Sequence, residues 1–219
     1  MKVILTGCTG FIGNEVLNQC LQNPSITAVV VLSRRALDIR ESDHPKLTVR
    51  IIDNFLSYPE PLLQDLDGAQ ACIWTLGKAV MTDMDLAREI HVDYPLAAAK
   101  AFDTAFGAKM PAGKKFRFIF CSGVLAERDQ NKSLWMAGEY RRIRGMAENE
   151  LVAYAKEHSG TFEAYIVRPG MVVSSDAYLK YMVFGLFSAI KVDALGSVMI
   201  ETALNGREKQ IFENSDMIK

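Results

Sequence analysis

Three glycines spaced three residues apart follow the first apolar run of the chain. Residues 1–5 read MKVIL, residues 6–13 read TGCTGFIG, and NEVL follows. This order predicts a strand, a turn that cradles phosphate and the start of a helix. Gly7 would permit the tight turn, Gly10 would let the backbone approach a pyrophosphate, and Gly13 would let the helix pack closely on the strand. The alternative is an ordinary glycine turn. The residues predicted to bind a nucleotide here are Gly7, Thr9, Gly10, Phe11, Ile12 and Gly13.

Basic residues stand at the end of the second predicted strand, where residues 32–35 read LSRR. In dinucleotide-binding sheets this position meets the adenosine ribose, and an acidic residue there selects a free 2′-hydroxyl. The chain has no carboxylate at this point, and Ser33 and Arg34, with Arg35 beside them, could bind a 2′-phosphate. The sequence therefore favours NADP(H) over NAD as cofactor. The alternative is that the two arginines begin a solvated loop.

The next two predicted strands end in residues that would contact the rest of such a nucleotide. Asp53 and Asn54 end the third strand, where the adenine ring would lie, although an ordinary turn explains them equally. Residues 75–77, at the end of the fourth strand, would pass close to the nicotinamide ribose. The predicted cofactor contacts thus include Asp53, Asn54, Thr75, Leu76 and Gly77.

The elements that must position these residues alternate between strands and helices. Apolar runs predict strands at 3–5, 28–32, 47–52, 71–75, 116–121 and 165–167, and helical spacing fills most of the gaps. This order is typical of an α/β fold with a single doubly wound parallel sheet and helices on both faces. Residues 83–106 should form a helix kinked at Pro95, and residues 134–157 a second long helix. We expect a single domain over 1–219, with residues 171–219 forming a small substrate-pocket segment.

The bulk composition excludes several classes of partner. The 219 residues include 25 basic and 26 acidic ones, so no broad positive field exists for nucleic acid or an anionic membrane. No apolar run reaches the length of a membrane span, and the first strand leaves no room for a signal peptide, so a cytoplasmic protein is expected. The four cysteines lack CxxC or Cys/His spacing, so we expect no metal site.

These features together resemble the short-chain dehydrogenase/reductase superfamily. The chain is similar to its small atypical members with a GxTGxxG loop, such as the Tat-interacting-protein-30-like and epimerase-like proteins, over nearly its whole length. Residues 6–13 match the cofactor loop, 121–123 the catalytic segment after strand five, 140–144 the catalytic helix, and 167–170 the end of strand six. The resemblance implies an NAD(P)-binding Rossmann-like domain, with Pro169 and Gly170 at the cofactor.

The catalytic positions of this family are only partly matched. The family uses a tyrosine as proton donor, a lysine four residues later that lowers its pKa, and a serine or threonine that polarises the carbonyl. The resemblance places Tyr140 at the tyrosine and Arg144 at the lysine, which keeps the charge but changes its shape. Gly123 takes the place of the hydroxyl residue, leaving Ser122 one position early. Tyr140 could instead merely cover the edge of the core.

Three functions follow from this resemblance. The first is an NADP(H)-dependent oxidoreductase for a small, largely apolar carbonyl or alcohol, with Tyr140, Arg144 and Ser122 as catalytic residues. The second is a cofactor-independent isomerase or cyclase, and the third a non-catalytic NADP(H)-sensing protein. His91, near Asp93, is a further acid–base candidate, although such neighbours are more often structural. Relatives often pair through the helices that carry Tyr94 and Tyr140, so a homodimer is expected. The residues that could wall an apolar pocket are Trp135, Met136, Met171, Tyr178, Tyr181, Phe184 and Phe187.

Overall fold

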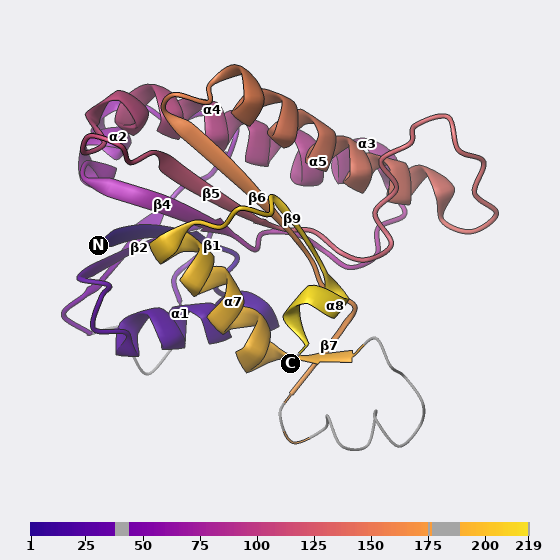
Figure 1. Ribbon diagram of the computed structural model, residues 1–219, viewed down its shortest axis with the longest axis horizontal. Helices are drawn as coiled ribbons and strands as arrows, with labels where there is room; N and C mark the ends of the chain where they lie inside the picture. The colour runs from indigo at the N-terminus through magenta and orange to yellow at the C-terminus, as the bar shows by residue number, and fades with distance from the viewer. Residues whose placement is uncertain (38–43, 175, 177–188, 219) are drawn as a thin grey trace.

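The protein is built around a seven-stranded parallel sheet. The structure is a computed structural model that describes residues 1–37, 44–174, 176 and 189–218. The strand order of the sheet is β3-β2-β1-β4-β5-β6-β9, with every neighbouring pair parallel (Figure 1). The order reverses between β1 and β4, so the crevice at the carboxyl ends of these strands is the expected ligand position. The strands are β1 (Lys2–Thr6), β2 (Ala28–Ser33), β3 (Leu47–Ile51), β4 (Ala69–Trp74), β5 (Phe116–Cys121), β6 (Phe162–Arg168) and β9 (Ile211–Glu213). The predicted α/β fold with a doubly wound parallel sheet is confirmed.

Apolar side chains project from both faces of the sheet and form two hydrophobic cores, one on each face. Val3 and Leu5 of β1 pack on one face and Ile4 on the other, because successive residues of a strand point to opposite sides. Helices α1 (Phe11–Gln22) and α7 (Val192–Asn205) cover the Val3 face. Helices α2 (Glu60–Leu66), α4 (Tyr94–Phe106) and α5 (Gly138–Glu157) cover the other face, where stacked and tilted aromatic rings fill the core. Helices thus lie on both faces of the sheet, as predicted (Figure 1).

The kinked helix predicted over residues 83–106 is three consecutive segments. Helix α3 (Met84–Arg88) is capped by the Asp83 side chain, which accepts from the Leu86 N–H at 3.0 Å. A π-helical turn, η1 (Glu89–Asp93), follows and leads directly into α4. Pro95 lacks the backbone N–H that an unbroken α-helix would direct to His91, so the widened turn lies where this bond is missing. The irregular turn therefore lies directly before α4 and contains His91.

The carboxyl-terminal part of the described chain contributes to the main sheet as well as to the pocket. A two-stranded parallel ribbon pairs β7 (Met171–Val173) with β8 (Ala189–Lys191), and α7 and β9 return to the central sheet. A short helix, α8 (Asn214–Met217), closes the described chain with a capping box formed by Glu213 and Asp216. The sequence patterns missed β9 and α8, because three- and four-residue elements carry too little periodicity. The predicted pocket residues Tyr178, Tyr181, Phe184 and Phe187 lie outside the described residues.

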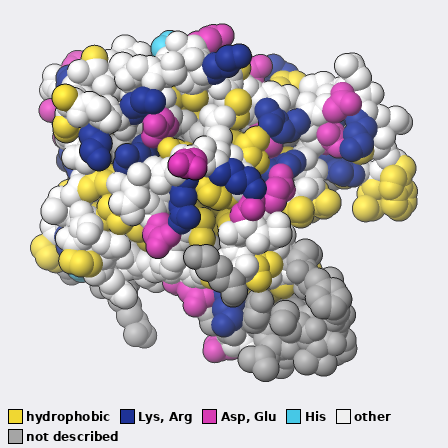
Figure 2. Space-filling view, in the orientation of Figure 1, with side chains coloured by type: hydrophobic (Ala, Val, Ile, Leu, Met, Phe, Trp, Pro, Cys, Tyr) yellow, Lys and Arg dark blue, Asp and Glu magenta, His cyan; other side chains and the backbone are white. Residues whose placement is uncertain are grey.

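The connection between β5 and α5 projects from the body of the molecule (Figure 1). Trp135 is 93% exposed and Met136 58% exposed, and apolar side chains gather at the end of this projection in Figure 2. Their expected place in the wall of an apolar pocket is therefore wrong. Helix α5 begins at Gly138 rather than at residue 134, after Ala137 with a φ of 47°. None of the helices in the described part of the chain combines the length and apolar character that crossing a bilayer requires.

Candidate active site

The glycine turn between β1 and α1 is closed so tightly that side chains are excluded from it. Gly7 has a φ of 74°, and a Cβ there would lie 2.6 Å from the carbonyl carbon of Thr75. A Cβ on Gly13 would lie 2.3 Å from the Gly7 oxygen, whereas one on Gly10 would lie 3.3 Å from the same oxygen. Gly10 is the N-cap of α1, and the first turn of this helix has no side-chain cap and no acidic residue. The backbone N–H groups of the first turn of α1, after Gly10, are therefore available to an anion, which is the role that the sequence predicts for this turn.

Two adjoining cavities open on this turn. One, of about 560 Å³, is lined by Thr9, Gly10 and Phe11 on one side and by Arg35 on the other. The second, of about 400 Å³, brings Gly7 and Leu76 together with Ser33, Arg34 and Arg35. The arginines are exposed, while Ser33 is buried and its hydroxyl accepts from the Arg35 N–H at 3.3 Å. The structure thus places Ser33, Arg34 and Arg35 beside the predicted phosphate turn, and Arg35 lines both cavities.

The third-strand residues lie apart from these cavities. Asp53 and Asn54 are exposed and line neither of them. The Asn54 side-chain oxygen accepts from the Leu56 N–H at 2.8 Å and closes a local turn. The ordinary-turn alternative accounts for Asn54 as the structure has it, and the adenine contact stays a prediction.

A third cavity, of about 380 Å³, lies at the carboxyl ends of β4, β5 and β6. Thr75 lines this cavity. The Thr75 hydroxyl donates to the Thr6 carbonyl at 2.6 Å and so joins the end of β4 to the end of β1. The cavity brings together eight predicted site residues from five separate stretches of sequence. Its lining includes Ile12, Thr75, Leu76, Gly77, Ser122, Arg144, Pro169 and Gly170, together with His91, Lys78 and Met171.

The Tyr140 hydroxyl is held by two protein partners beside this cavity. It donates to the Lys78 carbonyl oxygen, and His91 Nε2 lies 3.1 Å from it. Because a carbonyl oxygen only accepts, we assign the phenol proton to that bond and the Nε2 proton of His91 to the bond with the phenol oxygen. Nδ1 of His91 is then the acceptor nitrogen. Tyr140 itself is buried and is not among the lining residues, so His91 stands between it and the cavity.

Arg144 lies over the face of Tyr140 and not at its hydroxyl. The guanidinium carbon is 5.9 Å from the ring centroid, and a Cβ on Gly123 would lie 3.3 Å from the Arg144 Nη2. The absence of a side chain at Gly123 therefore gives the guanidinium its room. Burial, followed by the charge of Arg144, lowers the pKa of His91 to about 4, so the imidazole is neutral near pH 7.

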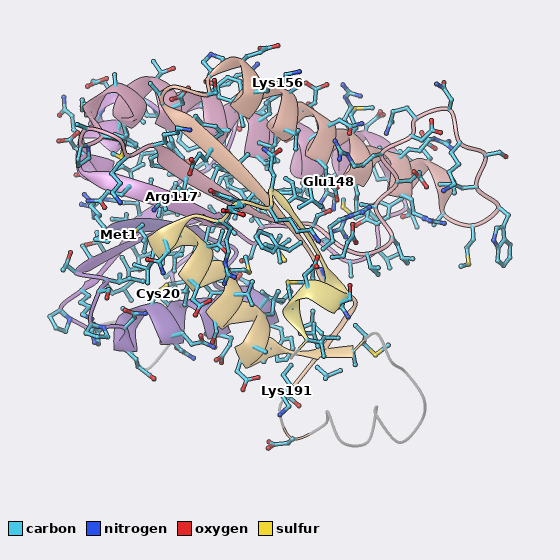
Figure 3. All side chains as sticks on the ribbon, in the orientation of Figure 1. Met1, Cys20, Arg117, Glu148, Lys156 and Lys191 are labelled. Carbon is cyan, nitrogen blue, oxygen red and sulfur yellow. The ribbon has the colours of Figure 1, made fainter. Side chains whose placement is uncertain are left out.

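Ser122 belongs to a buried polar network at the ends of β5 and β6. Its hydroxyl donates to Glu148 Oε1 at 2.5 Å, and Arg168 Nε lies 3.2 Å from the same oxygen. Glu148 is completely buried on α5 (Figure 3), and burial raises the pKa of its carboxyl. Arg168 also pairs with Glu213 at 2.7 Å. Although Ser122 lines the cavity, its hydroxyl proton is directed toward Glu148 and away from a ligand. The ion pairs of Arg168 hold the residue directly before Pro169 and Gly170.

Two of these residues were difficult to find by sequence reasoning. Glu148 has no motif around it, and only its position four residues after Arg144, on the same face of α5, connects it to the site. His91 was considered only as a secondary candidate. The signal that marks it is the proline four residues later, which makes an irregular turn at the histidine predictable.

The comparisons agree with this architecture. No family model matches the chain. A short-chain dehydrogenase from Burkholderia cenocepacia, solved with NADP, superposes with a TM-score of 0.72 at 14% identity, covering 96% of this chain and 87% of that one. The yeast methylglyoxal/isovaleraldehyde reductase Gre2, solved with NADPH, has a TM-score of 0.66 at 13% identity, covering 97% and 78%. The chain therefore has the short-chain dehydrogenase/reductase fold, and the predicted resemblance is confirmed at this level.

Two proteins similar to this chain in sequence have names that refer to fungal biosynthesis. Leucinostatins biosynthesis cluster protein T of Purpureocillium lilacinum is 35% identical over 123 residues, which are 56% of this chain and 42% of that protein. The nonribosomal peptide synthetase inpA of Emericella nidulans is 26% identical over 210 residues, covering 80% of this chain and 14% of the synthetase. The chain thus spans less than half the length of either relative.

Proposed function

We propose that the protein is an NADP(H)-dependent oxidoreductase that interconverts a small carbonyl compound and its alcohol. The observation that carries the proposal is the glycine turn packed against Thr75, because it adjoins both the arginine-lined cavities and the cavity at the strand ends. Structural neighbours solved with NADP or NADPH support a nicotinamide nucleotide. Others were solved with NAD, so the preference for NADP(H) depends on Ser33, Arg34 and Arg35 of this chain.

The residues present fit such a nucleotide. The uncapped N–H groups after Gly10 would bind the pyrophosphate, and the arginines would bind the 2′-phosphate. Thr75, Leu76 and Gly77 would border the nicotinamide ribose. The nucleotide would supply hydride transfer at its nicotinamide ring. In the reducing direction, the carbonyl carbon gains the hydride and the oxygen gains a proton from the protein.

Tyr140 is the proposed source of that proton. The phenol would have to turn from the Lys78 carbonyl toward the cavity, while His91 Nε2–H stays bonded to its oxygen and stabilises the negative charge that develops there. His91 would thus take the place of the lysine that the family uses, and Arg144 would add positive charge above the ring.

The test is NADPH oxidation, followed by absorbance, with a panel of small aldehydes, ketones and oxo acids. We expect turnover with at least one of them and a loss of roughly 10²-fold or more in Tyr140→Phe, since a positioned proton donor contributes on this order. Undiminished turnover in Tyr140→Phe would remove this residue from the mechanism.

One observation favours a second candidate. The Tyr140 and Ser122 hydroxyls both donate to protein acceptors, which suits a pocket without redox chemistry, either a cofactor-independent isomerase or cyclase or an NADP(H)-sensing protein. An isomerase or cyclase would form product after all nicotinamide nucleotide is removed. A sensor would bind NADPH without turnover and change its affinity for a partner. A requirement for NADPH in stoichiometric amounts excludes both.

A further inference from the structure

An unpaired guanidinium lies in the cavity at the strand ends. Arg144 is half-buried, and among the described residues no carboxylate lies within ion-pair distance of it. The described lining of this cavity contains a second cation, Lys78, and no Asp or Glu. By contrast, the neighbouring Arg168 has two carboxylate partners. A half-buried guanidinium without a carboxylate partner can still bind an anionic ligand that enters the cavity.

The charge of Arg144 affects the pKa values of two neighbours. It lowers the pKa of His91, after the larger effect of burial, and it opposes the rise that burial produces in the pKa of Cys121. Its contacts are the face of Tyr140 and the bare backbone at Gly123, which leave the forked N–H donors without an acceptor in the described chain. This geometry suits bidentate recognition of a carboxylate.

The cavity also has a neutral acceptor close to the guanidinium. His91 and Gly77 both line the cavity, and the assigned tautomer makes Nδ1 of His91 an acceptor. A ligand with a carboxylate and a hydroxyl would satisfy Arg144 and His91 together. The cavity of about 380 Å³ would also hold the nicotinamide ribose at Thr75, Leu76 and Gly77, so only a small ligand fits beside the nucleotide.

We infer that Arg144 binds the carboxylate of the substrate, so that the protein acts on small oxo acids and the corresponding hydroxy acids. This inference rests on the proposed function for the reaction, and it narrows the substrate from a carbonyl compound to one that bears an anionic group. A phosphate of the nucleotide is the other source of an anion. The arginines at the end of β2 and the N-cap residue Gly10 line two other cavities, and these are the proposed phosphate sites of the nucleotide.

The experiment compares matched acids and neutral analogues. Calorimetry on the NADPH-saturated protein would use 2-hydroxybutanoate and 2-hydroxybutanamide, which form no product with reduced nucleotide. We expect the acid to bind at least about tenfold more tightly than the amide, equivalent to about 1.4 kcal/mol. Arg144→Gln should abolish this preference, and Arg144→Lys should retain part of it because the charge remains. The matched control is Arg142→Gln on the same helix, whose guanidinium donates to the Lys132 carbonyl at 3.2 Å outside the cavity.

The outcomes separate this inference from the proposed function. Equal binding of acid and amide by the wild type, or an acid preference that survives in Arg144→Gln, overturns the inference. A large loss of NADPH affinity in Arg144→Gln, with an unchanged acid preference, assigns the residue to the nucleotide and also overturns it. Acid-selective binding without NADPH oxidation on 2-oxobutanoate and related oxo acids supports the anion site and counts against the redox function. Turnover of neutral carbonyls, with no preference for the acid, supports the redox function and counts against the anion site.

Discussion

His91 joins the phenol of Tyr140 to the wall of the cavity at the strand ends. Its imidazole is 4% exposed, and it keeps a neutral form because burial and the charge of Arg144 both oppose protonation. The described groups that act on it are the Tyr140 phenol and the Arg144 guanidinium from α5, and the Lys78 carbonyl from the loop after β4. The site therefore depends on a histidine that is neutral where the protein works.

Acid should destabilise the protein through this residue. The pKa of His91 falls from 6.5 to about 4 on folding, so between these values the unfolded chain binds a proton that the folded chain does not. Stability therefore decreases as pH falls through this window, by roughly 3 kcal/mol in total. Urea unfolding of His91→Gln should show a flatter dependence of the unfolding free energy between pH 7 and pH 4.5.

The comparison is made between variants, because Glu148, with its raised pKa, contributes a dependence of the opposite sign in every one of them. His158→Gln, at an exposed histidine, controls for the loss of an imidazole as such. If the free energy of unfolding depends on pH in the same way for wild type and His91→Gln, the lowered pKa of His91 is contradicted.

For single residues of the site, the sequence indicates which side chains take part better than it indicates what they contact. The Tyr140 and Arg144 pair was predictable from spacing, since four residues on a helix bring two side chains to one face. The Lys78 carbonyl and Glu148 were not, because they meet Tyr140 and Ser122 only through the packing of α5 on the sheet. Contacts of this kind depend on tertiary structure and leave no local pattern.

The turn between β1 and α1 shows how one element depends on another. Its glycines are required by contact with Thr75 at the end of β4, and the Thr75 hydroxyl holds that strand to the Thr6 carbonyl. The roles predicted for Gly7 and Gly13 correspond to the two positions where a Cβ would clash. Gly10 has more room, so its absence of a side chain matters chiefly for the approach of a ligand.

A methyl group on Gly13 should push α1 from the sheet. The added Cβ would lie 2.3 Å from the Gly7 oxygen and 2.6 Å from the Thr75 hydroxyl, neither of which can move without breaking the turn. We expect Gly13→Ala to lower the free energy of unfolding by roughly 1–3 kcal/mol and to weaken NADPH binding. Denaturant unfolding measures the first effect. Gly160→Ala, with no atom within 4 Å of its added Cβ, is the matched control. A Gly13→Ala protein as stable as this control would show that the turn is looser than described.

The whole fold was largely predictable, because each central strand is a continuous apolar run and each long helix has regular apolar spacing. The uncertain parts were short or irregular. Strand β9 has three residues, and the π-helical turn arises where Pro95 removes a backbone donor. The start of α5 was also misplaced, since the exposed Trp135 and Met136 extend its apolar pattern without belonging to the core.

For the whole molecule, we propose that the described cavities accept NADPH and select it through Ser33, Arg34 and Arg35. Calorimetric titration of nucleotide-free protein with NADPH and NADH, side by side, tests it most directly. We predict NADPH binding at least about tenfold tighter than NADH binding, with the difference abolished in Arg34→Gln/Arg35→Gln, because both arginines line the second cavity beside Ser33, where the 2′-phosphate would bind. Equal or stronger binding of NADH, or binding of neither nucleotide, would contradict it.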